Sequence, residues 1–222
     1  HIIRTVGTPT KASKINGGRK AGLKQLSAFA NHRSSEYQEQ RNVLALSGTS
    51  RLGAHHKFGT VAVQETYAAV NSSEFRKQLY WRDFYNYLVW WNPDLLRGQS
   101  APKKLVNAPM NPHMDIPWKS KGKEWTAWCR GKTGYLIVDA GMRQLNQSGW
   151  MHNRARMVVA MFLTKNLQID WRLGEKYFAQ NLVDYDPAQN NGGWQWSSST
   201  GADSQPYFRI FNPWLQTKRF DP

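Results

Sequence analysis

The chain has 222 residues, a mass of 25.6 kDa and a hydrophobic fraction of 40%, a composition that can bury one large or two small cores and excludes a disordered chain. Thirty Lys and Arg against 15 Asp and Glu give a formal net charge of +15. No apolar run reaches about 18 residues, which excludes a membrane-spanning helix, and the single cysteine, Cys129, excludes an internal disulfide.

The first third of the chain is predicted to hold a tail and two helices. Residues 1–20 are polar and basic and contain glycines, a composition typical of a linker or tail ahead of a helical domain over 21–222. Apolar residues at helical spacing predict helices over 21–31 and about 60–69. The intervening residues 32–53 are predicted to form a loop.

A long helix is predicted next, because apolar residues recur at helical spacing and Ser72 or Ser73 can cap its start. The helix should stop at Asn92, since Pro93 disfavours helical backbone at the residue before it. From there to Thr133 the chain is rich in Pro, Gly and Lys, which predicts loops and short helices.

The last third is also predicted to be helical. Two helices are expected over 139–149 and 151–166, and Asp170 can cap a third one. The segment DYDPAQNNGG, residues 184–193, is predicted to be a turn-rich loop, followed by irregular or helical structure. Since no segment alternates apolar and polar residues as a strand does, the predicted fold class is all-α.

The net charge and the aromatic residues indicate which class of molecule the protein binds. A basic excess fits a merely soluble basic surface or a polyanion, either nucleic acid or a phosphorylated ligand. Eleven Trp residues occur in the chain, and indole rings are stacking platforms for bases. This combination favours a nucleic-acid partner.

Three segments carry residue types that suit a nucleotide or a ring. TSRLG at 49–53 offers hydroxyls, backbone donors and a guanidinium that can hold a pyrophosphate. In WMHNRARM at 150–157, a helix would bring Asn153, Arg156 and Met157 to one face. The alternatives are an ordinary helix cap for the first segment and a solvated helix face for the second.

The third segment is DYDPAQNNGGWQW at 184–196, where two carboxylates could accept hydrogen bonds from a ribose or a ring, and paired glycines would let backbone approach a planar ligand. The alternative is a plain loop. His152 is expected to be structural or exposed. The adjacent His55 and His56 would point differently, so no metal site is predicted.

Taken together, these segments resemble the FAD-binding domain of the photolyase/cryptochrome family, most closely the class I cyclobutane pyrimidine dimer photolyases. The resemblance rests on TSRLG, QLYWRDFY, GKTGYLIVDAGMRQL, the stretch from GWMHNRARM to GEKYF, and LVDYDPAQNNGGWQWSSSTGADSQPYFRIFNP, in the order and spacing of the family. It covers the chain from Gly17 to Pro222. It implies a helical domain that binds FAD and damaged DNA containing pyrimidine dimers, inside the cell where DNA is.

The resemblance also implies roles for individual residues. Phe75 stands where the family often has Trp, Asn190 would lie near the N5 edge of the flavin, and Arg82 would pair with Asp184. The implied FAD contacts are Tyr37, Thr49, Ser50, Arg51, Leu52, Gly53, Phe75, Arg82, Asn153, Arg156, Asp184, Asp186 and Asn190.

The resemblance also implies which residues contact DNA and which transfer electrons. Trp81 and Trp196 would form aromatic walls around a flipped dimer. The implied DNA contacts are Arg41, Gln78, Trp81, Asn153, Arg154, Met157, Trp196, Arg209 and Gln216. The implied catalytic residues are Gln78, Asn190 and an electron-transfer chain of Trp194, Trp171 and Trp118.

The sequence departs from the family pattern in two ways. The family's N-terminal α/β antenna domain and its usual C-terminal segment lie outside this sequence, so the chain is expected to be a fragment, a split protein or a reduced version. A separate antenna domain or chain is one candidate partner, and the antenna chromophore stays unknown. Gln78 stands where dimer photolyases carry a carboxylate.

The expected activity is a light-driven carbon–carbon lyase that splits cyclobutane dimers. Met157 favours this lesion, because photolyases for the (6–4) product carry a histidine there. A cryptochrome-type photoreceptor and a nucleic-acid-binding module without a cofactor are the alternatives.

Overall fold

The computed structural model describes residues 16–97, 116–202 and 209–221, and within these ranges all regular elements are helices. The predicted all-α fold is therefore confirmed. An isolated bridge between Lys119 and Ile169 is the extent of β pairing in the described ranges. Most of the predicted N-terminal tail lies outside the described residues, and the division into a tail and a domain stays a prediction. No helix within the described ranges combines the length and the apolar character needed to cross a bilayer.

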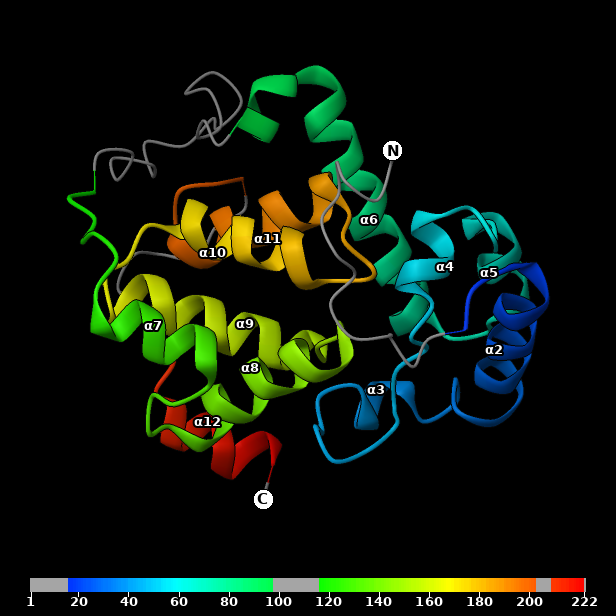
Figure 1. Cartoon of the computed structure of the whole chain (residues 1–222). Helices are drawn as coiled ribbons and strands as arrows, with labels where there is room; N and C mark the ends of the chain where they lie inside the picture. Colours follow the sequence, from blue (N-terminus) through cyan, green and yellow to red (C-terminus); the bar gives the residue numbers. More distant parts are fainter. Residues whose placement is uncertain (1–15, 98–115, 203–208, 222) are drawn as a thin grey trace.

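A first group of helices, at one end of the molecule in Figure 1, surrounds a small core. Its members are α2 (Arg19–His32), α3 (Tyr37–Gln40), α4 (Gly53–Lys57), α5 (Val63–Ala69) and the first turns of α6 (Ser73–Trp91). Phe29, Tyr37 and Phe75 fill this core with ring centroids 4.8–5.9 Å apart. The predicted helices over 21–31 and 60–69 are confirmed with shifted ends, whereas α3 and α4 fall in segments where no helix was expected.

The long helix α6 leaves this first group and packs against the second one (Figure 1). It begins as predicted, since the Ser72 hydroxyl accepts a hydrogen bond from the Phe75 amide at 3.4 Å. It ends at Trp91, and the short 3₁₀ helix η1 (Pro93–Arg97) follows. The proline therefore sets the end of the helix, as the sequence predicted.

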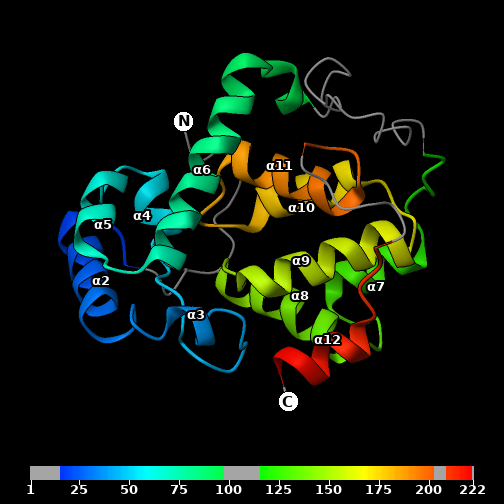
Figure 2. The same ribbon diagram turned by 180° about the vertical axis from the view of Figure 1, so that it is seen from behind.

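A second group of helices surrounds a larger core. It comprises α7 (Lys123–Arg130), α8 (Leu136–Ser148), α9 (Asn153–Met161), the π-helical turn η2 (Phe162–Asn166), α10 (Trp171–Asn181), α11 (Pro187–Ser198) and α12 (Pro213–Phe220). Figure 2 shows α8 and α9 side by side beneath α10 and α11. Trp128, Trp171, Phe178 and Trp194 are almost fully buried in this core.

The prediction of a turn-rich loop over 184–193 is wrong for residues 187–193, which form the first turns of α11. The Asp186 carboxylate accepts hydrogen bonds from the amides of Ala188 and Gln189, at 3.1 and 3.3 Å. Pro187 occupies the first helical position, where its fixed φ suits a helix and its missing N–H is not needed. Asp-Pro therefore starts a helix here, and the two glycines lie inside it.

Candidate functional site

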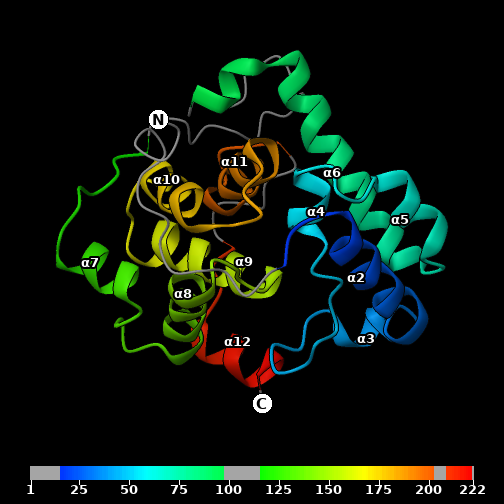
Figure 3. The ribbon, with the colours of Figure 1, turned by 45° about the vertical axis from the view of Figure 1, so that its right-hand side comes forward.

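A cavity of about 650 Å³ lies between the two groups of helices, within the usual size range of ligand pockets. In Figure 3 the two groups lie on opposite sides of the molecule, with α2 to α5 on the right and α7, α8 and α10 on the left. The cavity wall combines the segment before α4, one side of α6, the start of α9, the turn before α11 and one face of α11. Segments far apart in the sequence thus share one site.

All of the residues that the resemblance implied as FAD contacts line this cavity. Of the implied DNA contacts, the cavity wall includes Arg41, Gln78, Trp81, Asn153, Met157 and Trp196. Arg154, Arg209 and Gln216 lie outside it. Of the implied electron-transfer residues, Trp194 lines the cavity, while Trp171 and Trp118 do not. The structure thus gathers most of the predicted site residues, and their roles stay predictions.

The ion pair inside the cavity differs from the expected one. Arg82 lies 3.6 Å from Asp83. Asp184 is held by Arg156 instead, whose Nη2 donates to both carboxylate oxygens at 3.0 and 2.8 Å while its Nε donates to the Met151 carbonyl. The expected pairing of Arg82 with Asp184 is therefore wrong, because α9 brings Arg156 directly to the turn that carries Asp184.

The segment TSRLG packs closely against this ion pair. A Cβ atom on Gly53 would lie 2.9 Å from the Asp184 carboxylate, so only glycine fits without a shift. Arg51 adopts a left-handed φ of 54°, and its guanidinium stacks on the Trp150 ring at 4.4 Å. Backbone strain of this kind tends to persist at functional sites. The donors of this loop and the exposed Arg51 suit a phosphate-bearing ligand.

Asn190 is fixed by a residue that the sequence did not single out. Its amide nitrogen donates to the Glu175 carboxylate at 3.0 Å and to the Glu175 carbonyl at 3.2 Å. The Tyr185 hydroxyl donates to the same carboxylate, and burial together with this carboxylate raises the pKa of Tyr185 to about 12. Since Glu175 takes the amide hydrogens, Asn190 has its carbonyl oxygen left for a ligand. No spacing rule links Glu175 to Asn190, because they lie on different helices.

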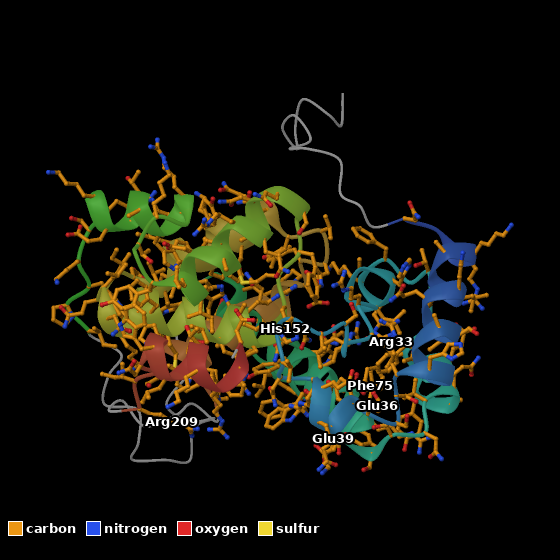
Figure 4. All side chains as sticks on the ribbon, turned by 90° about the horizontal axis from the view of Figure 1, so that it is seen from below. Arg33, Glu36, Glu39, Phe75, His152 and Arg209 are labelled. Atoms are coloured by element: carbon orange, nitrogen blue, oxygen red, sulfur yellow. The ribbon has the colours of Figure 1, made fainter. Side chains whose placement is uncertain are left out.

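Asn153 and Met157 share one face of α9, as the spacing predicted. The Asn153 amide nitrogen lies 3.8 Å from the Met157 sulfur, and both residues line the cavity. His152 directly before them is buried, and Figure 4 shows it where the two groups of helices meet. Its Nδ1 accepts from the Arg154 amide at 3.1 Å and caps α9, which confirms the structural role expected for this residue.

His152 is expected to make stability depend on pH. Burial and the nearby Arg154, Arg156 and Arg51 lower its pKa to about 4, so the unfolded chain binds the proton first as pH falls. The contribution of His152 to the free energy of unfolding should be fully present above pH 6.5, which is near the pKa of a histidine in the unfolded chain. This contribution should decline by up to about 3 kcal/mol as the pH drops towards 4. His152→Asn keeps the cap without titrating. Urea unfolding of both proteins from pH 7 to pH 4 should show a shallower decline in the variant, and equal slopes would contradict the assignment.

A cluster of arginines lies beside α12, and one of its members, Arg41, also lines the cavity. Burial and the nearby Arg41, Arg219 and Arg209 lower the pKa of Arg154. The Arg154 guanidinium donates to Asn42 Oδ1 at 2.7 Å and stacks on Phe220 at 4.3 Å. Figure 4 shows Arg209 next to α12. The sequence reasoning missed Arg219, and four cations gathered in this way make a surface suited to phosphates.

The two adjacent histidines have separate hydroxyl partners. His55 Nδ1 lies 2.8 Å from Thr60 Oγ1, and His56 Nε2 lies 2.9 Å from Thr66 Oγ1. Burial, Arg82 and His55 lower the pKa of His56 to about 4, which keeps its ring neutral in the cavity wall. Within the described residues, no group of three or more His, Cys, Asp or Glu side chains could hold a metal ion.

The two glycines of α11 are expected to respond oppositely to alanine. A Cβ on Gly192 would lie 2.2 Å from the Tyr85 ring, whereas a Cβ on Gly193 would meet nothing within 4 Å. Gly192→Ala should destabilise the fold by about 1–3 kcal/mol through overpacking, and Gly193→Ala should stabilise it by about 0.4–1 kcal/mol. Since Gly193 lines the cavity, its variant should also bind the cavity ligand less tightly. Thermal unfolding of the two variants checks the opposite signs.

Comparison with known proteins agrees with this geometry. Residues 75–222 match the model of the FAD-binding domain of DNA photolyase. The deoxyribodipyrimidine photo-lyase of Alkalihalophilus pseudofirmus is 45% identical over 212 residues, which cover 92% of this chain and 42% of that protein. The class III photolyase of Agrobacterium tumefaciens superposes with a TM-score of 0.85 at 41% identity, over 94% of this chain and 43% of that one. A Synechocystis cryptochrome superposes with a TM-score of 0.83 at 32% identity, over 96% and 45% of the two chains.

The chain spans about two fifths of the length of the curated relatives it matches. The matched segment begins at Phe75 in α6, after the TSRLG part of the cavity wall, and continues through the Arg156–Asp184 pair and α11. Because that match takes in two thirds of the sequence and the same helical architecture recurs in the solved relatives, the chain belongs to the family of FAD-binding domains of DNA photolyase.

Proposed function

We propose that this chain binds FAD in the central cavity and uses it for light-driven splitting of cyclobutane pyrimidine dimers in DNA. The observation that carries the proposal is the cavity itself, in which a charged and polar wall and an aromatic rim face the same space. The polar wall suits a dinucleotide with a flavin ring, and the aromatic rim suits a second planar group stacked beside it.

The residues present fit the cofactor on chemical grounds. Donors of the TSRLG segment would hold the phosphates, and the Arg156–Asp184 pair and the Asn190 carbonyl would face the polar edge of the flavin ring. FAD would supply the light-driven one-electron chemistry. The chain's own residues orient the ring, exclude water and fix the charges around it, which are the usual contributions of the protein in a cofactor enzyme.

The rim of the cavity fits a flipped pyrimidine dimer. Trp81 is 45% exposed and lies on α6, while Trp196 is half-buried on α11, so the two indoles approach the opening from different helices. Met157 offers a thioether, which cannot exchange a proton with a lesion. A cyclobutane dimer, whose splitting needs mainly electron transfer and packing, is therefore a better substrate for this site than a (6–4) product. The arginine cluster beside α12 would hold the strand that carries the lesion.

Two measurements test the proposal. Purified protein incubated with FAD should release a stoichiometric flavin on heating, and irradiated oligothymidine should lose its dimers when this protein is illuminated with blue light. If the protein takes up no FAD, the hypothesis that remains is a nucleic-acid-binding module without a cofactor. Flavin binding without repair would favour a cryptochrome-type photoreceptor, a reading supported by the amide at Gln78 and by the similarity to the Synechocystis cryptochrome.

Gln78→Glu is expected to raise repair per absorbed photon. Gln78 lines the cavity one turn before Trp81, and its amide nitrogen donates back to the Glu74 carbonyl at 3.3 Å. An amide can still hydrogen-bond a thymine edge, but it has no ionisable proton to stabilise the charged dimer. Affinity for dimer-containing DNA should change little. Quantum yields of both proteins on the same oligonucleotide check this, and an equal or lower yield in the variant would show that the site is built around the amide.

A further inference from the structure

His56 contributes an imidazole ring to the cavity wall from α4. Its Nε2 lies 2.9 Å from the hydroxyl oxygen of Thr66 on α5, and burial together with the nearby Arg82 of α6 keeps the ring neutral by lowering its pKa to about 4. Arg82 also lines the cavity, whereas Thr66 and the neighbouring His55 do not. One ring nitrogen of His56 is therefore bound to α5, and the state of the other decides what the ring offers to a ligand.

The Thr66 hydroxyl determines which nitrogen of His56 carries the hydrogen. Thr66 is fully buried, and its hydroxyl donates to the Ala62 carbonyl at 3.3 Å. Because a hydroxyl has a single hydrogen, Thr66 keeps this bond and also binds His56 only by accepting from Nε2–H. In a neutral imidazole the other nitrogen is then an acceptor. His56 therefore carries its hydrogen on Nε2 and a lone pair on Nδ1.

Nδ1 of His56 is open to a ligand. It has no hydrogen-bond partner among the described residues. In the same part of the chain, the buried side-chain atoms that lack a partner are His152 Nε2 and Gln216 Oε1, so Nδ1 of His56 is reached by solvent. Since His56 lies in the cavity wall, a ligand with a hydrogen-bond donor can take the place of that solvent.

We propose that Nδ1 of His56 accepts a hydrogen bond from a hydroxyl group of the cavity ligand, and that Thr66 is the positioning residue that keeps the hydrogen on Nε2. The inference rests on the proposed binding of FAD. The Arg82 guanidinium close to His56 suits a phosphate. In FAD the ribityl and ribose hydroxyls flank the pyrophosphate, so a dinucleotide held by its phosphates brings hydroxyl hydrogens to this wall.

The neighbouring His55 has the opposite arrangement and provides an internal comparison. Its Nδ1 lies 2.8 Å from Thr60 Oγ1, and the Thr60 hydroxyl donates to the His55 carbonyl at 3.3 Å. By the same reasoning, Nδ1 of His55 carries the hydrogen. A Cβ on Gly22 would lie 2.9 Å from this nitrogen, so the buried His55 ring packs α4 against α2. Two successive histidines thus hold opposite tautomers, one for packing and one for the cavity.

Two substitutions separate the ligand contact of His56 from its structural contact. Glutamine can place its amide NH₂ near the position of Nε2, so His56→Gln keeps the bond to Thr66 and loses the acceptor at the Nδ1 position. Asparagine is one carbon shorter and can place its carbonyl oxygen near the position of Nδ1, so His56→Asn keeps this acceptor and loses the bond to Thr66. A purely structural histidine and a ligand-binding histidine therefore predict opposite orders of the two variants.

The experiment compares FAD affinity with stability in these variants. His56→Gln and His56→Leu should raise the Kd for FAD roughly three- to tenfold, which is the effect of one neutral hydrogen bond, while His56→Asn should stay within about twofold of the parent. The midpoint of urea unfolding should instead fall more in His56→Asn than in His56→Gln. Thr66→Val should also raise the Kd, because the ring can then carry its hydrogen on Nδ1. Thr60→Val acts on His55 outside the cavity and is the matched control, with an unchanged Kd.

A second readout locates the hydrogen without using FAD affinity. Long-range ¹H–¹⁵N NMR spectra of the ligand-free protein should show the hydrogen on Nε2 of His56 and on Nδ1 of His55, and Thr66→Val should move only the hydrogen of His56. Addition of FAD should shift the ¹⁵N signal of His56 Nδ1 and leave that of His55 in place. FMN and ADP identify the donor, because a loss of affinity in His56→Gln for FMN assigns it to the ribityl chain and a loss for ADP assigns it to the ribose.

The outcomes separate this contact from the proposed function. Parent protein that takes up no FAD would overturn both. Parent protein that binds FAD, together with His56→Gln and His56→Leu variants of unchanged affinity, would overturn the His56 contact alone. A ligand-free spectrum with the hydrogen of His56 on Nδ1 would do the same.

Discussion

Replacing Trp194 by phenylalanine is expected to abolish photoreduction of bound FAD while leaving FAD binding nearly intact. Trp194 is 2% exposed and its ring packs against Trp128 and Phe178, and a Cβ on Gly174 would lie 2.2 Å from it. Phenylalanine keeps an aromatic ring in this space but lacks the readily oxidised indole. Because Trp194 is the member of the implied chain that lines the cavity, neither Trp171 nor Trp118 can substitute for it.

The measurement is the bleaching of oxidised flavin under blue light in the presence of a thiol, compared between the two proteins at equal flavin content. Trp214→Phe provides the control, since that indole is 60% exposed and contacts Tyr135 outside the cavity. If the Trp194 variant bleached at the parent rate, a different donor would supply the electron and the assignment of Trp194 would be wrong.

Arg156→Ala is expected to destabilise the fold and to remove FAD binding together. The substitution leaves the Asp184 carboxylate, whose side chain is 10% exposed, without the guanidinium that donates to both of its oxygens. Removing one partner of a buried pair typically costs about 3–5 kcal/mol, and the 26% exposure of the Arg156 side chain places this pair near the lower end, about 3 kcal/mol. The cavity would also lose the guanidinium that we propose faces the flavin edge.

Urea unfolding and flavin retention after gel filtration check this result. Arg172→Ala is the matched control, because Arg172 pairs with Asp170 at 3.1 Å on the exposed side of α10 and such surface pairs contribute at most about 1 kcal/mol. Equal free energies of unfolding for Arg156→Ala and Arg172→Ala would contradict this expectation. Water in the cavity would then be screening the Asp184 carboxylate, despite the low exposure of its side chain. Asp184→Asn should be milder than Arg156→Ala, because it removes the charge that needs a partner.

The sequence predicted those parts of the fold that depend on local patterns. Ser72 and Asp170 cap helices as expected, and Pro93 ends α6, because a cap or a proline acts within a few residues. The segment DYDPAQNNGG was misjudged because two glycines and two asparagines indicate a turn, whereas packing of Gly192 on Tyr85 gives these residues a place inside a helix. Tertiary packing therefore outweighed local propensity at α11.

In the candidate site, too, the sequence predicted what depends on local motifs and failed where contacts between helices decide. Family motifs brought the cavity residues together correctly, yet the partner of Asp184 was misassigned, because sequence does not show which of two arginines from α6 and α9 reaches the turn before α11. Glu175 was missed for a related reason. Its contact with Asn190 joins α10 to α11, and no periodicity within either helix indicates it. Contacts between helices need the three-dimensional arrangement.

The cavity lies between two separate hydrophobic cores, and this placement has a consequence for how the molecule opens and closes. Contacts between the two groups of helices include those of α6 with α11, the bond from Arg154 to Asn42, the stacking of Arg51 on Trp150 and the packing of Gly53 against Asp184. Much of their facing surface borders the cavity. A ligand that fills the cavity therefore contacts both groups at once and ties them into one cooperative unit. Amide hydrogens of α4 and of α9 should then gain protection from exchange by the same factor when the ligand binds, although the two helices belong to different cores.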